Sequence, residues 1–410
     1  MVKPQGHWLI LTQYYAPEIG APQIRLRALA RHLDQAGIDV EVLTAMPNYP
    51  AGKVFAGYSR RWHVRERIDD IPVRRTWVYA ATGKSALARM ANYLSFTTTA
   101  LIAALTGPRP DLLFVESQPL SLGLIAILMR FFRGVPYIYN VPDLQVDVAR
   151  QLGFVRNSIL LRLAFSAENM FLRGSWRIST VTYSFIDHFV SRGSPRQKIT
   201  FLPNGADSDF LKPRPPSRAL LDRWGLHNRK VFVYVGTHAY YHGLDVIIEA
   251  ATLLRDREDI AFLMIGDGPE RIRIKQMAVD RHLSTVIFGD SPYDEMDQLY
   301  SVAYASIATL RNIDVAKAMR LSKVFPSLSC GVPVIYAGTG EAADLLRATN
   351  SGIVIEPESA TQLAESILHL SADPDLRQRM GSQGRILVEK EYSWSVLVER
   401  WLSKLGFCDS

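Results

Sequence analysis

The chain has 410 residues, 48% hydrophobic and 21% charged, which is ordinary for a soluble globular protein but too long for one core, so we expect two domains. Its two cysteines exclude a disulfide framework. Neither a signal-peptide pattern nor an apolar run of 18 residues occurs, so we expect a cytoplasmic protein without a membrane-spanning helix. The net charge of +7 is uneven, because residues 1–205 hold 24 Lys and Arg against 13 Asp and Glu, a balance of +11 that leaves −4 for the remainder.

Short apolar runs alternate with helical patterns along the first half of the chain. The helix expected at 22–37 places Leu26, Leu29 and Leu33 mainly on one stripe. The expected strands lie at 7–12, 39–44, 71–79, 111–117, 136–139, 177–182 and 198–203. This alternation is typical of a parallel sheet covered by helices.

The same rhythm restarts after a segment rich in Asn, Asp and Pro, which we interpret as a linker at 206–222. The strands expected beyond it lie at 231–236, 261–268, 286–290, 305–310, 332–337 and 352–357. The pattern therefore predicts the α/β class with two doubly wound, Rossmann-like domains, at 1–205 and 223–385. Ligands bind beyond the carboxyl ends of such strands, and the cleft between two such domains is the default site.

Glycines follow several of the expected strands. Gly20 stands before a helix whose free N–H groups could hold an anion, although an ordinary turn explains it equally well. Gly236 ends another strand, followed by His238 and His242. No third ligand at suitable spacing accompanies these histidines, so we expect no metal site. Hydrogen bonds to phosphate or sugar are the functional interpretation of the two histidines, and exposed loop residues are the alternative.

Two more turns carry glycine-rich patterns. Gly266 and Asp267 belong to a tight turn that could contact a nucleotide. Gly338-x-Gly340-x-x-Ala matches the relaxed dinucleotide fingerprint, with Glu358 twenty residues beyond Gly338. That fingerprint normally opens a Rossmann domain and here comes late. A phosphate or sugar at the helix N-terminus is enough to explain the glycines.

The segment 322–335 combines a cation, a proline and a buried strand. Proline belongs in a first helical turn, so Pro326 predicts a helix start near residues 323–325. Lys323 then lies beside free N–H groups and forms an anion site with them. In the first half, Asp143 and Asp147 follow a strand, and Asp143 is the better candidate for a cleft because it lies nearer the strand's end.

Taken together, these segments resemble the GT4 family of GT-B glycosyltransferases, in its WbuB/WcaI-like branch. The most specific part runs from "QYYAPEIGAPQIR" to "GKVFAGY", and the resemblance covers nearly the whole chain. "LPNGADSDFLKP", "VGTHAYYHGLDVIIEAA", "IGDGPE" and "SKVFPSLSCGVPVIYAGTGEAADLL" match in order.

The resemblance implies a GT-B fold with two sheets facing a central cleft, and a C-terminal helix at 386–410 that crosses back to the first domain. It implies retaining transfer from a UDP- or GDP-linked sugar on the second domain to an acceptor on the basic first domain. The acceptor would be lipid-linked or a polysaccharide precursor in O-antigen, capsule or exopolysaccharide assembly. No divalent metal or other cofactor is implied.

The resemblance also suggests roles for particular residues. The catalytic candidates are Asp143 and Lys323. The acceptor side would hold Arg25 and Asp143. The donor would be bound by Gly20, Gly236, His242, Gly266, Asp267, Lys317, Lys323 and Glu341.

The basic first half predicts an anionic partner. No nucleic-acid module occurs, so we expect no nucleic acid but a phosphorylated acceptor or peripheral contact with an anionic membrane on its cytoplasmic face. A solvated basic face is the alternative. The apolar helices at 91–105 and 121–132 either lie in the membrane interface or cover the first sheet.

Two positions depart from the family pattern. Pro326 replaces a Glu that many members use to bind the nucleotide ribose, and Pro142 replaces a His. Altered contacts are our interpretation. A non-catalytic GT-B binding subunit and a GT-B sugar-nucleotide epimerase remain alternatives, and a dehydrogenase rests only on the glycines near Gly338.

Overall fold

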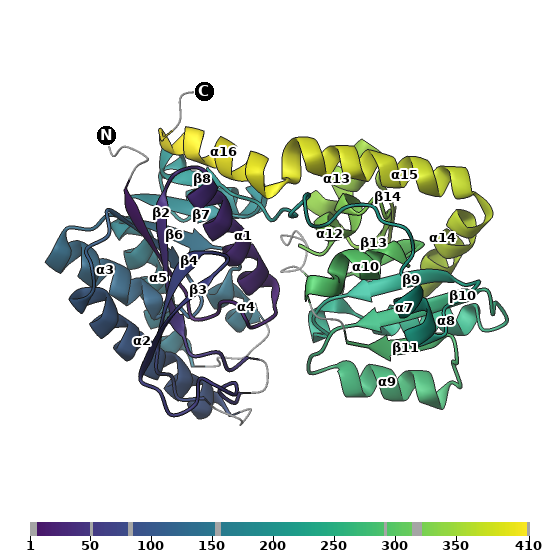
Figure 1. Cartoon of the computed structure of the whole chain (residues 1–410), viewed down its shortest axis with the longest axis horizontal. Helices are drawn as coiled ribbons and strands as arrows, with labels where there is room; N and C mark the ends of the chain where they lie inside the picture. Colours follow the sequence, from purple (N-terminus) through teal and green to yellow (C-terminus); the bar gives the residue numbers. More distant parts are fainter. Residues whose placement is uncertain are drawn as a thin grey trace. The chain divides into compact units, whose positions relative to one another are not determined.

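The computed structural model describes residues 6–49, 52–80, 85–151, 157–290, 293–313 and 322–407. It divides the chain into two compact units. Unit 1 comprises Met1–Pro203 and Leu397–Ser410, and unit 2 comprises Asn204–Val396. Each unit is built on its own sheet (Figure 1).

Unit 1 is built on an eight-stranded sheet in the order β3-β4-β2-β1-β5-β6-β7-β8. All neighbours are parallel except β3 and β4, which form an antiparallel hairpin. The strands are β1 (His7–Leu11), β2 (Asp39–Ala45), β3 (His63–Ile68), β4 (Ile71–Thr76), β5 (Leu112–Glu116), β6 (Tyr137–Val141), β7 (Arg177–Thr180) and β8 (Ile199–Phe201).

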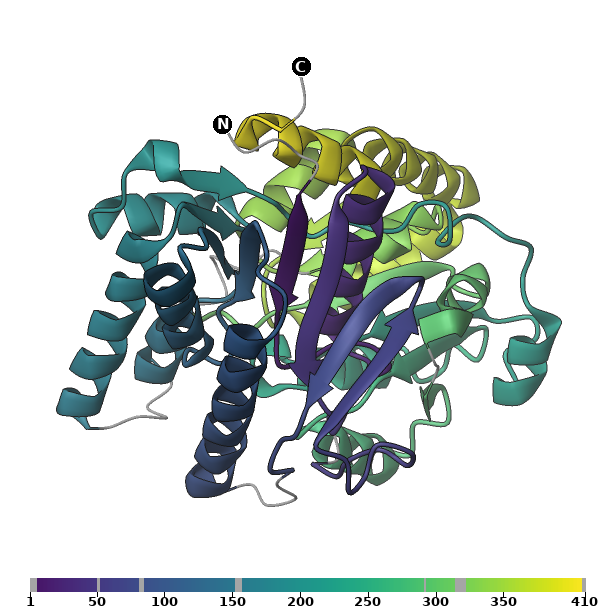
Figure 2. The same ribbon diagram turned by 60° about the vertical axis from the view of Figure 1, so that its left-hand side comes forward.

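Helices cover both faces of this sheet. They are α1 (Ala21–Gln35), α2 (Ala86–Thr106), α3 (Leu122–Arg133), α4 (Gln145–Gln151), α5 (Ser158–Gly174), α6 (Tyr183–Ser191) and the 3-10 turn η1 (Arg196–Lys198). Figures 1 and 2 show α1 on one side of the strands, with α2 and α3 on the other. This arrangement follows from right-handed crossovers that run in opposite directions along the sheet, from β1 to β2 through α1 and from β4 to β5 through α2.

The apolar helices expected at 91–105 and 121–132 are α2 and α3, and both cover the sheet. α2 packs on α3, and α3 packs on α5. Phe96 and Ala100 of α2 are buried, whereas Leu94 and Ile102 are exposed. Among the described residues, no helix is both long and apolar enough to span a bilayer.

Unit 1 is completed by the last helix, α16 (Trp394–Leu405). Trp401 packs edge-on against Trp8 of β1 and Phe114 of β5, with ring centroids 6.2 Å and 5.9 Å away. Its indole N–H donates to Thr200 Oγ1 at 3.1 Å. The aromatic core of this unit thus joins the first strand to a helix near the end of the chain.

Unit 2 is built on a six-stranded, fully parallel sheet in the order β11-β10-β9-β12-β13-β14. Its strands are β9 (Lys230–Val235), β10 (Ile260–Ile265), β11 (Val286–Gly289), β12 (Ala305–Thr309), β13 (Val334–Ala337) and β14 (Gly352–Ile355). Burial of the four central strands on both faces explains their continuous apolar sequences.

Two hydrophobic cores, one on each face of the sheet, hold the helices of unit 2. α8, α9 and α14 contribute to one core, and α7, α10, α12 and α13 to the other. The helices are α7 (Arg218–Trp224), α8 (Asp245–Leu253), α9 (Arg271–Asp280), α10 (Met296–Ser301), α12 (Val324–Ser329), α13 (Glu341–Thr349), α14 (Ala360–Ala372) and α15 (Pro374–Leu387), followed by a π-helical turn at Val388–Tyr392.

The α/β class and the two doubly wound sheets are confirmed. One strand was not predicted: β3, whose sequence HVRERI is mostly charged and whose residues alternate between exposed and half-buried at the edge of the sheet. It pairs with β4 through a turn in which Asp69 and Asp70 take positive φ. The strand predicted at 71–79 ends earlier, at Thr76.

Candidate active site

Two loops at the carboxyl ends of β9 and β10 are joined by backbone hydrogen bonds. Gly236 N donates to Ile265 O at 3.0 Å, and His238 N donates to Asp267 O at 2.8 Å. Gly266 has a φ of +128°, and a Cβ there would lie 2.1 Å from Gly236 O. Glycine at 266 is therefore required by both backbone conformation and space.

Lys323 lies beside this pair of loops, as the N-cap of α12. Its Nζ donates to the Tyr234 hydroxyl at 2.8 Å and lies 3.4 Å from His242 Nε2. A Cβ on Gly236 would be 3.0 Å from Nζ, so the glycine leaves room for the ammonium. Within the described part of the chain, no ion pair joins Lys323 to a carboxylate.

Part of the Lys323 side chain is exposed, but its ammonium is packed among protein atoms and has little contact with water. This burial lowers the pKa of Lys323 to about 7. A cation enclosed without a counter-charge is costly, and an anionic ligand would offset that cost. The arrangement therefore suits a group such as a phosphate.

The two predicted loop histidines are buried rather than exposed. Burial lowers the pKa of His238 to about 4, with Arg271 and Lys323 acting in the same direction. Burial also holds the pKa of His242 well below its usual value. Neither ring nitrogen of His238 has a hydrogen-bond partner among the described residues. Sequence reasoning considered both histidines for hydrogen bonds to phosphate or sugar but placed only His242 in the donor site, and nothing local shows that the His238 ring is enclosed.

The other donor-side candidates have different environments. Asp267 is exposed, and its Oδ1 accepts from Gly268 N at 2.8 Å, so the side chain stabilises its own turn. Glu341 is half-buried in the first turn of α13, directly after Gly340 at φ +81°. Lys317 lies outside the described residues. Glu358, suggested by the dinucleotide pattern, forms an ion pair with Arg311 at 2.8 Å.

In unit 1, the loops that follow β1 and β2 are held together by a residue that sequence reasoning missed. Glu18 is buried, and its Oε1 accepts from the backbone N–H groups of Asn48 and Tyr49, at 2.6 Å and 2.8 Å. Gly20 caps α1 in an extended conformation, and a Cβ there would lie 2.5 Å from Gln23 Oε1. Glu18 thus links the loop after β1 to the loop after β2, and both loops belong to the part of the sequence that most resembles the family.

A polar network lies at the carboxyl ends of β5 and β6. Arg25 forms an ion pair of 2.5 Å with Glu116, which also accepts from Asn140 Nδ2 at 2.9 Å. Asp143 Oδ2 accepts from Gln118 Nε2 at 3.1 Å. Burial raises the pKa of Asp143 to about 6, although the nearby Arg25 charge opposes that rise. The structure thus groups two candidates, Arg25 and Asp143, while Asp147 pairs instead with Arg150 and His188.

Pro326 lies in the first turn of α12, in agreement with the predicted helix start. Its missing N–H removes no helical hydrogen bond there, and its carbonyl accepts from Cys330 N at 3.2 Å. We therefore expect Pro326→Glu to fold with a melting temperature close to that of the wild type, since an acidic side chain suits a helix N-terminus. A collapse of the fold, seen by circular dichroism, would show instead that the proline ring is structurally essential.

The two doubly wound, largely parallel sheets have the GT-B fold, which similar solved structures share. The chain belongs to the GT4-like, group 1 glycosyltransferases: the Glycosyl transferase 4-like domain matches residues 20–205, and the Glycosyl transferases group 1 domain matches residues 221–386.

Individual relatives agree with this assignment. The putative colanic acid biosynthesis glycosyl transferase WcaI of Escherichia coli K12 is 26% identical over 86% of this chain and 89% of its own length. A GDP-mannose-dependent phosphatidylinositol monomannoside mannosyltransferase of Mycobacterium tuberculosis is 27% identical over 52% of this chain and 57% of its own. The solved structure of Anabaena Alr3699/HepE with UDP-glucose has a TM-score of 0.74 and 16% identity, covering 98% of this chain and all of the other.

Proposed function

We propose that this chain moves a sugar from a UDP- or GDP-linked donor bound by unit 2 to a lipid-linked or polysaccharide-precursor acceptor bound by unit 1. The observation that carries the proposal is the enclosed ammonium of Lys323, beside Gly236 and without a carboxylate partner in the described residues. Such a group is suited to hold the diphosphate of the donor.

The relatives support this choice of substrates. HepE was solved with UDP-glucose, and the mycobacterial relative uses GDP-mannose and a phosphatidylinositol-linked acceptor. WcaI is named for colanic acid biosynthesis. A nucleotide-sugar donor and an acceptor in bacterial surface polysaccharide assembly are therefore the proposed substrates.

The reaction breaks the bond between the sugar C1 and the distal phosphate oxygen, and the electron pair leaves with the diphosphate. The acceptor hydroxyl oxygen forms the new bond to C1 on the same face, so configuration is retained, and its proton passes to the leaving diphosphate. Lys323 and the first-turn N–H groups of α13, which has no side-chain cap, would stabilise the developing negative charge. Glu341, in the first turn of α13, would accept hydrogen bonds from donor hydroxyls. No divalent metal takes part.

Asp143 is the proposed acceptor-side group. With a pKa of about 6, its carboxylate is ionised near neutral pH and can accept a hydrogen bond from the acceptor hydroxyl. Gln118 fixes the position of Oδ2 at 3.1 Å.

Asp143→Asn is expected to lower the transfer rate by about 100-fold while leaving the fold at least as stable at pH 7. The folded pKa is raised above the usual carboxyl value, so the charged form costs stability as the pH rises through about 6. Asparagine removes that cost. Initial rates and thermal unfolding of the two proteins at pH 7 measure both effects.

Asp187→Asn is the matched control, because Asp187 is exposed on α6 and lies outside the polar network. If Asp143→Asn transferred sugar at the wild-type rate, the Asp143 carboxylate would have no role in the mechanism.

Exposed apolar side chains support peripheral contact with a membrane, where a lipid-linked acceptor resides. Leu87, Met90 and Leu94 of α2 and Ile159 and Leu160 of α5 are each more than half exposed. They lie in the first halves of their helices, nearer the carboxyl ends of the strands and the polar network around Asp143.

Titration of the purified chain with UDP and GDP tests the proposal first. A screen of UDP- and GDP-sugars in the presence of EDTA, with mass detection of products, then identifies the donor. Binding of neither nucleotide would contradict the proposal. Binding without hydrolysis or transfer of any donor would favour a non-catalytic binding subunit.

A further inference from the structure

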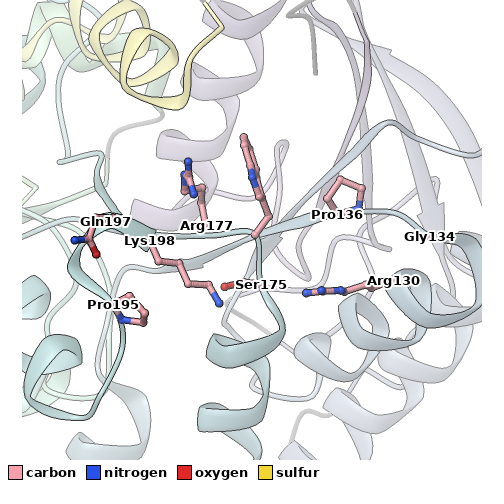
Figure 3. A pocket seen from close by; sticks show the side chains of 9 residues that line it. Arg130, Gly134, Pro136, Ser175, Arg177, Pro195, Gln197 and Lys198 are labelled. Carbon is pink, nitrogen blue, oxygen red and sulfur yellow. The ribbon is translucent and has the colours of Figure 1, made fainter. Parts of the chain in front are cut away.

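A cavity of about 680 Å³ opens in unit 1 at the amino ends of β6, β7 and β8 (Figure 3). Its lining comes from the end of α3 and from the residues that lead into these three strands. Asp143 and Gln118 follow the carboxyl ends of β6 and β5, at the opposite edge of the same sheet. The cavity is therefore separate from the candidate active site.

Three cations line the cavity: Arg130, Arg177 and Lys198. Figure 3 shows Arg130 and Lys198 extending toward each other with Ser175 between them. In the described ranges, no ion pair joins any of the three to a carboxylate. Burial lowers the pKa of Lys198, and the charges of Arg130 and Arg177 lower it further. The cavity therefore concentrates positive charge without protein counter-charge.

Capping of helix α5 explains part of this arrangement. Lys198 Nζ donates to the carbonyl oxygens of Leu172 and Arg173 at 2.7 Å and 2.8 Å, and Arg130 donates to that of Gly174. Cations at a helix C-terminus are favourable. Arg177 makes no such contact, since its guanidinium lies over the Trp176 ring, 4.9 Å from the centroid. Helix capping therefore does not explain why Arg177 lines the cavity. It also uses only one N–H group of Arg130, so the others can bind a ligand.

Two phenylalanines directly follow Arg130 at the end of α3. Phe131 is 80% exposed and Phe132 is 65% exposed, and their rings contact each other edge-on with centroids 5.0 Å apart. Adjacent aromatic rings in water beside a basic pocket are typical of surfaces that enter a membrane interface, where the cations meet phosphate groups. This pairing favours a lipid over a soluble phosphate as the occupant.

We propose that the pocket of Arg130, Arg177 and Lys198 binds the phosphodiester head group of an anionic phospholipid, with Phe131 and Phe132 entering the interface beside it. The proposal rests on the membrane contact proposed above and gives that contact a second, specific site. Unlike the apolar residues near the polar network, this site would recognise a head group rather than an acceptor.

Flotation of the full chain with vesicles of phosphatidylcholine, with and without phosphatidylglycerol, tests the site. The wild type is expected to float with the anionic vesicles. Arg177→Gln should bind them about fivefold more weakly, and Arg130→Gln with Arg177→Gln more weakly still. Phe131→Ser with Phe132→Ser should lose about tenfold or more.

The matched controls remove the same groups elsewhere. Arg65→Gln removes an exposed charge on β3 of the same unit, and Ile272→Ser removes an exposed apolar side chain on α9. Both should float like the wild type. Equal losses in Arg65→Gln and Arg177→Gln would overturn the site in favour of a diffuse basic surface. Losses in the charge variants but not in the phenylalanine variant would overturn the entry of Phe131 and Phe132 into the interface.

Nucleotide binding is measured on the same samples and separates the two proposals. Arg177→Gln should bind UDP or GDP as the wild type does, because Arg177 lies in neither candidate substrate site. It should also unfold at nearly the same temperature, because Arg177 forms no ion pair with a carboxylate in the described ranges. Failure of vesicle binding with nucleotide binding intact would overturn only the lipid site. Vesicle binding without any nucleotide binding would leave the lipid site and contradict the transferase.

Discussion

Lys323→Ala is expected to weaken donor binding about 100-fold, equivalent to about 3 kcal/mol, because it removes a charged hydrogen-bond donor from an enclosed site. The reason is geometric. The ammonium of Lys323 lies 2.8 Å from the Tyr234 hydroxyl and 3.4 Å from His242 Nε2, and both groups are neutral. No carboxylate in the described structure forms an ion pair with this ammonium, so none competes with a diphosphate for it. Calorimetric titration with UDP-glucose measures the loss.

Lys275→Ala is the matched control, because Lys275 is exposed on α9 and carries the same charge. Its affinity for UDP-glucose should equal that of the wild type. Equal affinities in Lys323→Ala and Lys275→Ala would show that the enclosed ammonium does not contact the donor.

The same group predicts how donor binding depends on pH. The pKa of Lys323 is lowered to about 7, so the free protein carries the ammonium below that pH and loses it above. Only the protonated form attracts the diphosphate, so the affinity for UDP-glucose should fall about tenfold between pH 6 and pH 8. UDP-glucose is the right probe because its diphosphate does not titrate in this range. Lys323→Ala should lose this dependence.

Stability separates loss of binding from loss of fold. A lysine whose folded pKa lies below its unfolded value of 10.5 costs stability below about pH 7, and this cost fades as the pH rises toward 10.5. Lys323→Ala removes the cost, so it should unfold at no lower temperature than the wild type at pH 7. Unfolding at a clearly lower temperature would mark the lysine as structural.

Gly266→Ala is expected to destabilise unit 2 by about 3 kcal/mol or more and to abolish donor binding. The new methyl group would lie 2.1 Å from Gly236 O, and the residue would keep a φ of +128° that alanine rarely adopts. Since Gly236 borders Lys323, any shift of this loop also displaces the ammonium site. Denaturant unfolding and UDP titration measure the two effects.

Gly225→Ala separates the collision from the backbone conformation. Gly225 has a φ of +61° at the end of α7, and a Cβ there would meet no atom within 4 Å. This control should cost only about 1 kcal/mol and keep nucleotide binding. Equal losses in the two variants would show that the collision at Gly236 is relieved without cost.

The regular layout of this chain could be predicted from its sequence because parallel strands buried on both faces read as continuous apolar runs. Strand β3 could not, since its sequence HVRERI holds only two apolar residues and three consecutive charged ones, so it lacks the alternation that marks a half-buried strand. Its existence depends on pairing with β4, which no local pattern specifies.

The parts of the candidate site that depend on backbone conformation could be predicted from the sequence. Glycines mark close approach of chain segments, and Pro326 marks a helix start, so Gly266 and Lys323 could be selected from sequence. The burial of His238 and the hydrogen bonds by which Glu18 joins two loops could not be predicted, because both depend on contacts between distant segments. The same holds for the raised pKa of Asp143, which follows from burial.

The aromatic core of unit 1 imposes an order of events during synthesis. Trp8 precedes unit 2 in the chain, whereas its partners Trp401 and Phe407 follow unit 2 and are made after it. Unit 2 is one continuous segment, so it can fold before unit 1 is finished. The first sheet therefore keeps part of its aromatic core uncovered until the residues beyond unit 2 have been made.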